Sequence, residues 1–251
     1  MKVFLGIYTC KYKQYCDVEF FDRILTLNPM PSQIFIVDNS LDNKGAYLKR
    51  IKQLMAKCSV PWEAVHIEEA VKKGESKSYP ARVICKSANK VREKFLKSDA
   101  DAMWILESDV FPIADDCVSM LAEHMDKYAA IGGIYYEGFH KPEWFKDDFN
   151  EIVPLETTTY IILSGCTLYR RDLVEKTAFR WGMVGDVHLL PDACYSHDLD
   201  CAGLKRANYT KIKCRHLCDE NKMRGWSVMY AEVEKKARKG GEGDDLNGVS
   251  D

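Results

Sequence analysis

The sequence has no run of about 18 apolar residues, the length that a membrane-spanning helix needs, so we expect no transmembrane segment. Residues 1–7 are apolar, but the stretch is short and no cleavage signal follows it, so we interpret it as a first strand and not as a signal peptide. A strong charge of either sign is also missing, because 36 Lys and Arg residues nearly balance 38 Asp and Glu residues. Any attraction to nucleic acid or to a membrane surface must therefore come from local basic patches.

Internal repeats are absent as well, and the 251 residues are 46% hydrophobic, which is enough for one sizeable core. We expect a single domain over residues 1–234. Charge and glycine dominate the remaining residues, which predicts a disordered tail over 235–251. Ten cysteines without a secretory signal predict free thiols and a reducing, cytoplasmic location.

Strands and helices alternate through the first 136 residues. Apolar runs predict strands at 3–9, 34–37, 62–67, 103–106 and 129–136. Amphipathic patterns predict helices at about 17–27, 44–57, 78–95 and 115–128. This alternation is typical of α/β proteins in which helices flank a mainly parallel sheet.

The pattern is looser after residue 137. We expect a strand at 160–163, a helix that opens at His197 and runs to about Ala207, and a last strand at 210–214. His216 lies just past the end of that last strand.

Two carboxylates, Glu107 and Asp109, directly follow the apolar run at 103–106. Open α/β sheets bind ligands at the carboxyl ends of their strands, so this pair is a candidate site. Two like charges in a partly dry cleft repel each other, and a divalent cation that prefers oxygen ligands, Mg²⁺ or Mn²⁺, is the simplest relief. The alternative is a strand that ends in a solvated acidic turn.

Charged residues also stand at the ends of two other predicted elements. Asp38 follows the second strand, and it is either a ligand-binding acid or part of an ordinary Asx turn. Arg82 lies in the first turn of the third helix. Its charge adds there to the positive end of the helix dipole and could meet an anion.

The order of these signals resembles the GT-A nucleotide-sugar glycosyltransferases, particularly their inverting family-2 type, over roughly residues 2–217. The resemblance implies a Rossmann-like GT-A fold with a nucleotide-sugar-binding half at 1–136 and an acceptor half at 137–234. The acidic motif departs at Glu107 from the family's usual Asp-x-Asp. The matching signals, in chain order, are Asp38, Arg82, Glu107-Ser108-Asp109, Ser164-Gly165-Cys166, His197-Asp198 and His216.

The resemblance implies a donor site built from the first half of the chain. Tyr8, Thr9 and Asp38 fall where the family holds the nucleotide base and ribose. Arg82 falls on a basic residue that contacts the base or the diphosphate. Glu107 falls near the ribose or behind the metal ion.

The resemblance also implies a metal site and an acceptor side. Asp109 falls on the direct metal ligand, and His216 falls where the family places an imidazole ligand. Trp181 falls on an aromatic residue that sugar rings stack on, with a core tryptophan as the alternative. Asp198 falls on the general base that deprotonates the acceptor hydroxyl, with Asp192 and Asp200 as rivals and helix capping as the alternative role.

The implied activity is the metal-dependent transfer of a sugar, with inversion, from a nucleotide-sugar such as a UDP-sugar to an acceptor hydroxyl. A glycan, a lipid head group or, as in phage enzymes of this resemblance, a hydroxymethylated base in DNA are the acceptors considered. Basic clusters at 86–97, 170–171, 205–206 and 211–215 would suit a phosphate backbone, and ordinary surface charge is their alternative explanation.

Other classes of function stay open at this point. Cys194, His197 and Cys201 lie close together in the sequence, as Cys214, His216 and Cys218 do, and either set could contribute to a zinc site. A nucleotidyltransferase would share the alternating pattern and the paired acids, although the loop after the first strand has no glycine. A binding protein that keeps the fold without catalysis is a further alternative.

Overall fold

The computed structural model describes residues 1–40, 45–67, 79–135, 150–155 and 165–217. Its strands, in chain order, are β1 (Val3–Thr9), β2 (Gln33–Asp38), β3 (Trp62–His66), β4 (Ala102–Glu107), β5 (Val110–Pro112), β6 (Ala130–Ile134), β7 (Ile152–Pro154), β8 (Cys166–Arg170), β9 (Gly182–Val184), β10 (Val187–Leu189) and β11 (Arg206–His216). Its α-helices are α1 (Asp17–Leu25), α2 (Ala46–Leu54), α3 (Tyr79–Leu96), α4 (Cys117–Ala122), α5 (Arg171–Lys176) and α6 (Pro191–Cys201), and the 3₁₀ helices are η1 (Lys11–Lys13) and η2 (Met55–Lys57). The expected strand at 160–163 and the expected tail at 235–251 lie outside these ranges.

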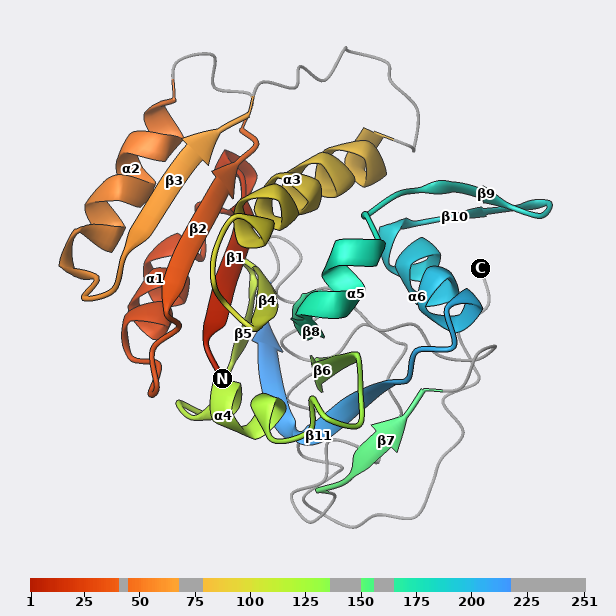
Figure 1. Ribbon diagram of the computed structural model, residues 1–251. Helices are drawn as coiled ribbons and strands as arrows, with labels where there is room; N and C mark the ends of the chain where they lie inside the picture. The colour runs from red at the N-terminus through yellow and green to blue at the C-terminus, as the bar shows by residue number, and fades with distance from the viewer. Residues whose placement is uncertain (41–44, 68–78, 136–149, 156–164, 218–251) are drawn as a thin grey trace, which may run out of the picture.

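One mixed sheet organises the fold, with the strand order β3-β2-β1-β4-β8-β6-β11-β5 and β7 beside β11 (Figure 1). The first four strands of that order are parallel. β8 then runs antiparallel to both of its neighbours, β4 and β6, whereas β6 and β11 are parallel. The predicted α/β sheet with flanking helices is thus confirmed, and its parallel part corresponds to the regular alternation in the first half of the sequence.

Helices cover both faces of the sheet, which explains why its central strands are apolar without interruption. Successive side chains of a strand point to opposite faces. On β1, Val3, Leu5 and Ile7 belong to the core under α1, α2 and α4, whereas Phe4 and Tyr8 belong to the core under α3, α5 and α6. Every residue of β1 is buried.

The expectation of a helix from His197 to Ala207 is wrong in its bounds. α6 begins at Pro191, whose fixed φ suits the first turn of a helix, and it ends at Cys201. Ala207 lies instead in β11, where alternating buried and exposed side chains mark a strand. His216 is the last residue of that strand. The shift matters for function, because the acid at the start of α6 is now Asp192 and not Asp198.

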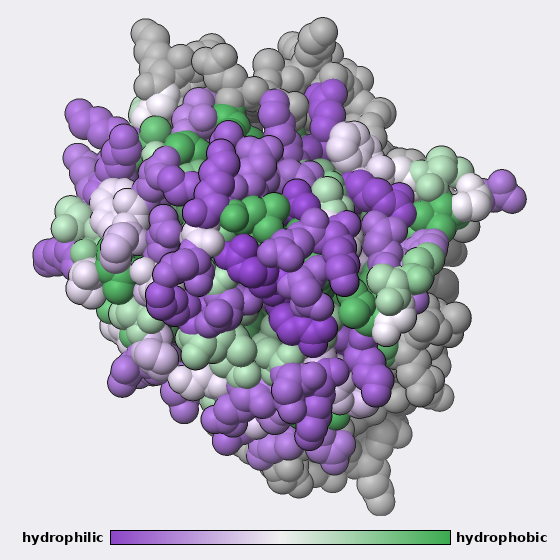
Figure 2. All heavy atoms as spheres, in the orientation of Figure 1, coloured by the Kyte–Doolittle hydropathy of each residue, from purple (hydrophilic) through white to green (hydrophobic). Residues whose placement is uncertain are grey.

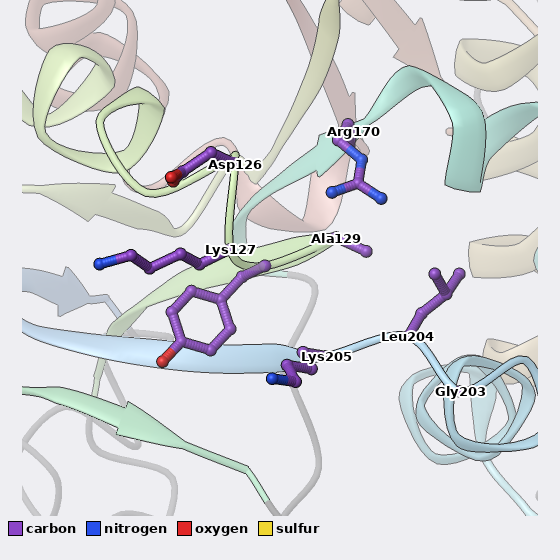
Figure 3. A pocket seen from close by; sticks show the side chains of 8 residues that line it. Asp126, Lys127, Ala129, Arg170, Gly203, Leu204 and Lys205 are labelled. Carbon is purple, nitrogen blue, oxygen red and sulfur yellow. The ribbon is translucent and has the colours of Figure 1, made fainter.

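The surface of the molecule has a mainly hydrophilic face (Figure 2) and a pocket. Hydrophilic side chains dominate the face of the molecule shown in Figure 2. A pocket of about 450 Å³ lies at the amino ends of β6 and β11 and is lined by Asp126, Lys127, Tyr128, Ala129, Arg170, Gly203, Leu204 and Lys205 (Figure 3). Arg170 pairs with Ala102 at the start of β4, so this pocket lies at the edge of the sheet opposite Glu107. Within the described ranges, no helix has the length and the apolar character that crossing a membrane requires.

Close packing of α3 on β1 gives a first prediction. A Cβ atom at Gly6 would stand 2.0 Å from Cγ1 of Val91, so Gly6→Ala should overpack this contact. We expect a loss of about 1–3 kcal/mol in the free energy of unfolding, measured with urea. The second substitution Val91→Ala should return part of that loss when added to Gly6→Ala. Equal stability of wild type and Gly6→Ala would contradict the close approach.

Candidate active site

The acids predicted as a site lie at the carboxyl end of β4, directly beside the end of β1. Tyr8 pairs with Glu107 in the parallel register of the two strands. The Tyr8 hydroxyl donates to Oε1 of Glu107 at 2.9 Å. Ser108 donates to Oγ1 of Thr9 at 2.7 Å, so the acidic motif is fastened to β1 by two side-chain hydrogen bonds. Tyr8 and Thr9 are themselves buried.

Lys13 is the central residue of the site that the sequence analysis missed. It ends η1, the single turn that follows β1, and its ammonium lies 2.7 Å from Oδ1 of Asp109 and 3.2 Å from Oε2 of Glu107. Its side chain is only 23% exposed. The sequence predicted that a divalent cation reduces the repulsion between the two carboxylates. In the structure, Lys13 of the chain itself already reduces that repulsion.

His216 reaches the same point from the other end of the chain. β11 pairs with β5 in a register that sets His216 opposite Val110, the residue after Asp109. Nε2 of His216 lies 3.7 Å from Oδ2 of Asp109. The backbone N–H of Leu217 donates to the carbonyl of Asp109 at 2.7 Å. The predicted pair Asp109 and His216 is thus brought together, although 107 positions separate the two residues.

The glycine turn before β8 closes the other side of the site. The N–H of Glu107 donates to the carbonyl of Gly165 at 3.0 Å. The N–H of Gly165 donates to the Tyr135 hydroxyl at 3.2 Å, and the Tyr135 ring packs edge-on against His216 at 5.6 Å between ring centroids. A Cβ at Gly165 would stand 2.4 Å from the Tyr135 hydroxyl, so a larger residue there would require the Tyr135 side chain to move.

The buried charges shift each other's pKa. Burial alone would raise the pKa of Asp109, but Lys13 and His216 outweigh it and lower that pKa to about 2. Burial likewise opposes the charge of Lys13, but Glu107 and Asp109 outweigh it and raise the pKa of Lys13 above its ordinary value. Asp109 and Lys13 are therefore both charged over the whole physiological pH range.

Asp38 is wholly buried, and both of its carboxylate oxygens have partners within the chain. Oδ1 accepts from the N–H of Ser40 at 2.9 Å and from its hydroxyl, and Oδ2 lies 3.0 Å from Nδ1 of His66. The first contact is the Asx turn that the sequence offered as the alternative to ligand binding. The predicted contact of Asp38 with a nucleotide remains a prediction.

Two further residues of the predicted donor site are partly exposed. Arg82 lies in the first turn of α3, as expected. Trp181 packs against the core under α3, α5 and α6 and keeps part of its surface exposed, so both of its proposed roles remain open. Ser78, the first residue of the helix predicted at 78–95, lies outside the described residues.

The three acids offered as general base have different surroundings. Asp198 accepts two hydrogen bonds from Arg180, at 2.8 and 2.5 Å. Asp200 forms an ion pair with the buried Arg206. Asp192 is partly exposed in the first turn of α6. Asp198 and Asp200 therefore fasten α6 to its neighbours, through Arg180 and Arg206.

A divalent ion fits the pair Asp109 and His216 but finds few other protein ligands. Two ligands of one octahedral ion at about 2.1 Å lie about 3 Å apart, so a shift of less than about 1 Å would bring Oδ2 and Nε2 onto one ion. No group of three His, Cys, Asp or Glu side chains arranged for a metal occurs in the described part of the chain. Such an ion would therefore complete its coordination with water or with the oxygens of a bound ligand, and a diphosphate carries such oxygens.

The zinc alternative loses support from the same geometry. Cys194 is buried, with its thiol directed at backbone carbonyls, and Cys214 is buried beside Cys166. Sγ of Cys201 and Nδ1 of His197 lie 3.2 Å apart, and Cys218 of the second candidate set lies outside the described residues.

Several cations of the predicted basic clusters have partners within the protein. Arg92 and Arg171 donate to backbone carbonyls at the ends of α5 and α3. Lys94 pairs with Glu63, and Arg215 pairs with Glu19. These contacts favour ordinary surface charge over a site for a phosphate backbone.

Comparison with known proteins adds information on the fold alone. No protein-family model matches the chain, and no curated protein matches its sequence. A mannosyltransferase from Pyrobaculum calidifontis, solved with GDP-Man and Mn²⁺, is similar with a TM-score of 0.60 and 14% identity, over 97% of this chain and 66% of its own. A fragment of TarS from S. aureus, solved with UDP-GlcNAc, is similar with a TM-score of 0.56 and 12% identity, over 88% of this chain and 59% of its own. The chain spans less than two thirds of the length of these structures. The similarity shows that it has the GT-A fold of nucleotide-sugar glycosyltransferases.

The low pKa of Asp109 predicts how stability depends on pH. Its folded-state pKa of about 2 lies below the ordinary 3.8, so its ionisation contributes stability that is complete above pH 3.8 and lost as the pH falls through about 2. Asp109→Asn should therefore unfold more easily than wild type near neutral pH, and the gap should narrow towards pH 2. Urea unfolding at several pH values measures it. A gap that is constant with pH would contradict the ion pair.

Proposed function

We propose that this protein is a glycosyltransferase that moves a sugar from a nucleotide-sugar to an acceptor hydroxyl. The observation that carries the proposal is the meeting of Lys13, Asp109 and His216 at the carboxyl end of the sheet. This is the edge where open α/β sheets bind nucleotides, and the fold is that of nucleotide-sugar enzymes. A carboxylate whose pKa is shifted by burial and by specific charged partners is a candidate for a functional residue.

The site has what the leaving group requires. As the glycosidic bond breaks, the diphosphate gains negative charge, which a cation stabilises. Asp109 and His216 would hold Mn²⁺ or Mg²⁺, which supplies that positive charge when bound. Glu107 keeps Lys13 and Tyr8 in place, and Arg82 at the start of α3 adds a further positive charge to the donor half.

We assign the general base to Asp192, one of the three acids that the sequence offered. Asp192 lies in the first turn of α6, which begins at Pro191. The resemblance places the general base at the start of this helix. Burial raises the pKa of Tyr169, and the charges of Asp192 and Glu107 raise it further, so both acids lie within electrostatic range of the same tyrosine. The carboxylate of Asp192 could take the proton of the acceptor hydroxyl while the sugar is displaced in line from its diphosphate, with inversion.

The donor and the acceptor are proposed as classes. A UDP-sugar remains the first donor to test, and the two similar structures hold GDP-Man and UDP-GlcNAc. The internal pairing of Arg92, Lys94, Arg171 and Arg215 gives no support to DNA as the acceptor. We therefore propose a glycan or lipid head-group hydroxyl ahead of a hydroxymethylated base.

Thermal unfolding with nucleotide-sugars tests the proposal. UDP- and GDP-sugars are added separately, with and without Mn²⁺, and at least one donor should raise the unfolding temperature more with the metal than without it. The matched control is Asp109→Asn, which should lose the metal-dependent part of the shift. If no nucleotide or nucleotide-sugar changes the unfolding temperature of wild type, the proposed function is wrong.

A pair of variants on α6 tests the assignment of the base. Asp192→Asn should lower kcat by at least about 100-fold and leave the KM for the donor nearly unchanged, because the base acts on the acceptor proton. Asp198→Asn removes the partner of Arg180, so it should lower the free energy of unfolding and have a smaller effect on kcat than Asp192→Asn has. Initial rates and urea unfolding of both variants separate the two roles. The reverse pattern would return the assignment to Asp198.

A further inference from the structure

The ammonium of Lys13 pairs with both Glu107 and Asp109 and leaves little room for a second cation beside them. Both oxygens of Glu107 have partners, Tyr8 on Oε1 and Lys13 on Oε2. Asp109 gives Oδ1 to Lys13, and its Oδ2 faces His216. A metal ion held by Asp109 and His216 would therefore share one carboxylate with Lys13.

Such sharing is unfavourable where the charges are shielded from water. The two oxygens of a carboxylate are close neighbours, so the ammonium and the metal ion would lie only a few ångström apart. The Asp109 side chain is 11% exposed, and like charges repel more strongly in such surroundings than in bulk solvent. Lys13 thus lowers the affinity of the site for a divalent ion as long as it stays on Asp109.

Lys13 is placed so that it can leave. It is the last residue of η1, a single 3₁₀ turn that has no buried residue. Its side chain has a flexible four-carbon stem, unlike the planar fork of an arginine. An ammonium released from Asp109 remains tethered beside the metal site, where it can bind an anion that arrives with the metal.

We propose that Lys13 is an exchangeable internal cation of the donor site. In the free protein it pairs with Glu107 and Asp109 and offsets one of their two negative charges. When a metal ion and a nucleotide bind together, it moves from the carboxylates to the diphosphate. The inference rests on the proposed function and names Lys13 as a diphosphate-binding residue of that site.

The exchange predicts effects of opposite sign on two ligands. Removing the charge of Lys13 vacates the carboxylates, so a metal ion added alone should bind more tightly. The same change removes a partner of the diphosphate, so UDP added together with saturating metal ion should bind more weakly. A purely structural lysine would, when replaced, weaken both.

Binding of Mn²⁺ without nucleotide is the first test. The signal of free Mn²⁺ in electron paramagnetic resonance gives the affinity for wild type, Lys13→Met and Lys13→Gln. Both variants should bind Mn²⁺ at least about tenfold more tightly than wild type. Lys13→Gln keeps a hydrogen-bond donor for the carboxylates and serves if Lys13→Met does not fold. The matched control is Lys11→Met, which removes an equal charge from an exposed position of the same turn.

Binding of UDP at saturating Mn²⁺ is the second test, measured by calorimetry. Both Lys13 variants should bind UDP at least about tenfold more weakly than wild type, whereas Lys11→Met should stay within about threefold. Unchanged or weaker Mn²⁺ binding in the Lys13 variants would overturn the exchange.

The outcomes separate the inference from the function. If Asp109→Asn weakens Mn²⁺ binding but Lys13→Met does not tighten it, the exchange is wrong and the metal site stands. If neither wild type nor Lys13→Met binds Mn²⁺ or UDP, both the exchange and the proposed donor site are wrong.

Discussion

The balance of charge among Lys13, Glu107 and Asp109 is the constraint on which the site depends. Two carboxylates at the end of a buried strand require a positive partner, and the chain provides one from the turn after β1. The same balance lowers the pKa of Asp109 and keeps it an anion. A site in which an internal cation already offsets part of the negative charge can exchange that cation for a metal ion without leaving both carboxylates unpaired, which suits a ligand that brings both a metal ion and phosphates.

The fold supplies this balance through strand order. β1 and β4 are neighbours, so the turn that carries Lys13 emerges beside the acidic motif. β11 crosses to β5 and carries His216 to Asp109 from the far end of the described chain. The glycine turn before β8 fits under Tyr135, which in turn packs against His216. Each part of the site thus comes from a different strand end, and the sheet holds them together.

Much of the fold could be predicted because the first half of the sequence has a strong local pattern. The apolar run before Glu107 and the helix from Asp17 gave elements close to those observed. The short strands β5 and β8 were not predicted, since three to five residues carry too weak a period. The start of α6 was misplaced because Asp198 resembles a residue that caps the start of a helix, whereas the helix begins at Pro191.

The site was predictable only in part, for a physical reason. Asp109 and His216 could be proposed from their places after strands, and the structure brings them together. Lys13 could not be singled out, because its contacts span 94 and 96 positions and depend on β1 lying beside β4. The contacts of Asp198 with Arg180 and of Asp38 with His66 are likewise tertiary, and a sequence pattern cannot show that these carboxylates already have such partners.

The central claim is that the site formed by Lys13, Asp109 and His216 binds the donor diphosphate together with a metal ion. Crystals grown with UDP and Mn²⁺ and measured at the manganese absorption edge test it most directly. The account predicts an anomalous peak between Oδ2 of Asp109 and Nε2 of His216, with phosphate oxygens on the metal and the ammonium of Lys13 on the diphosphate. Nucleotide bound elsewhere, with Lys13 still seated on Glu107 and Asp109, would contradict it.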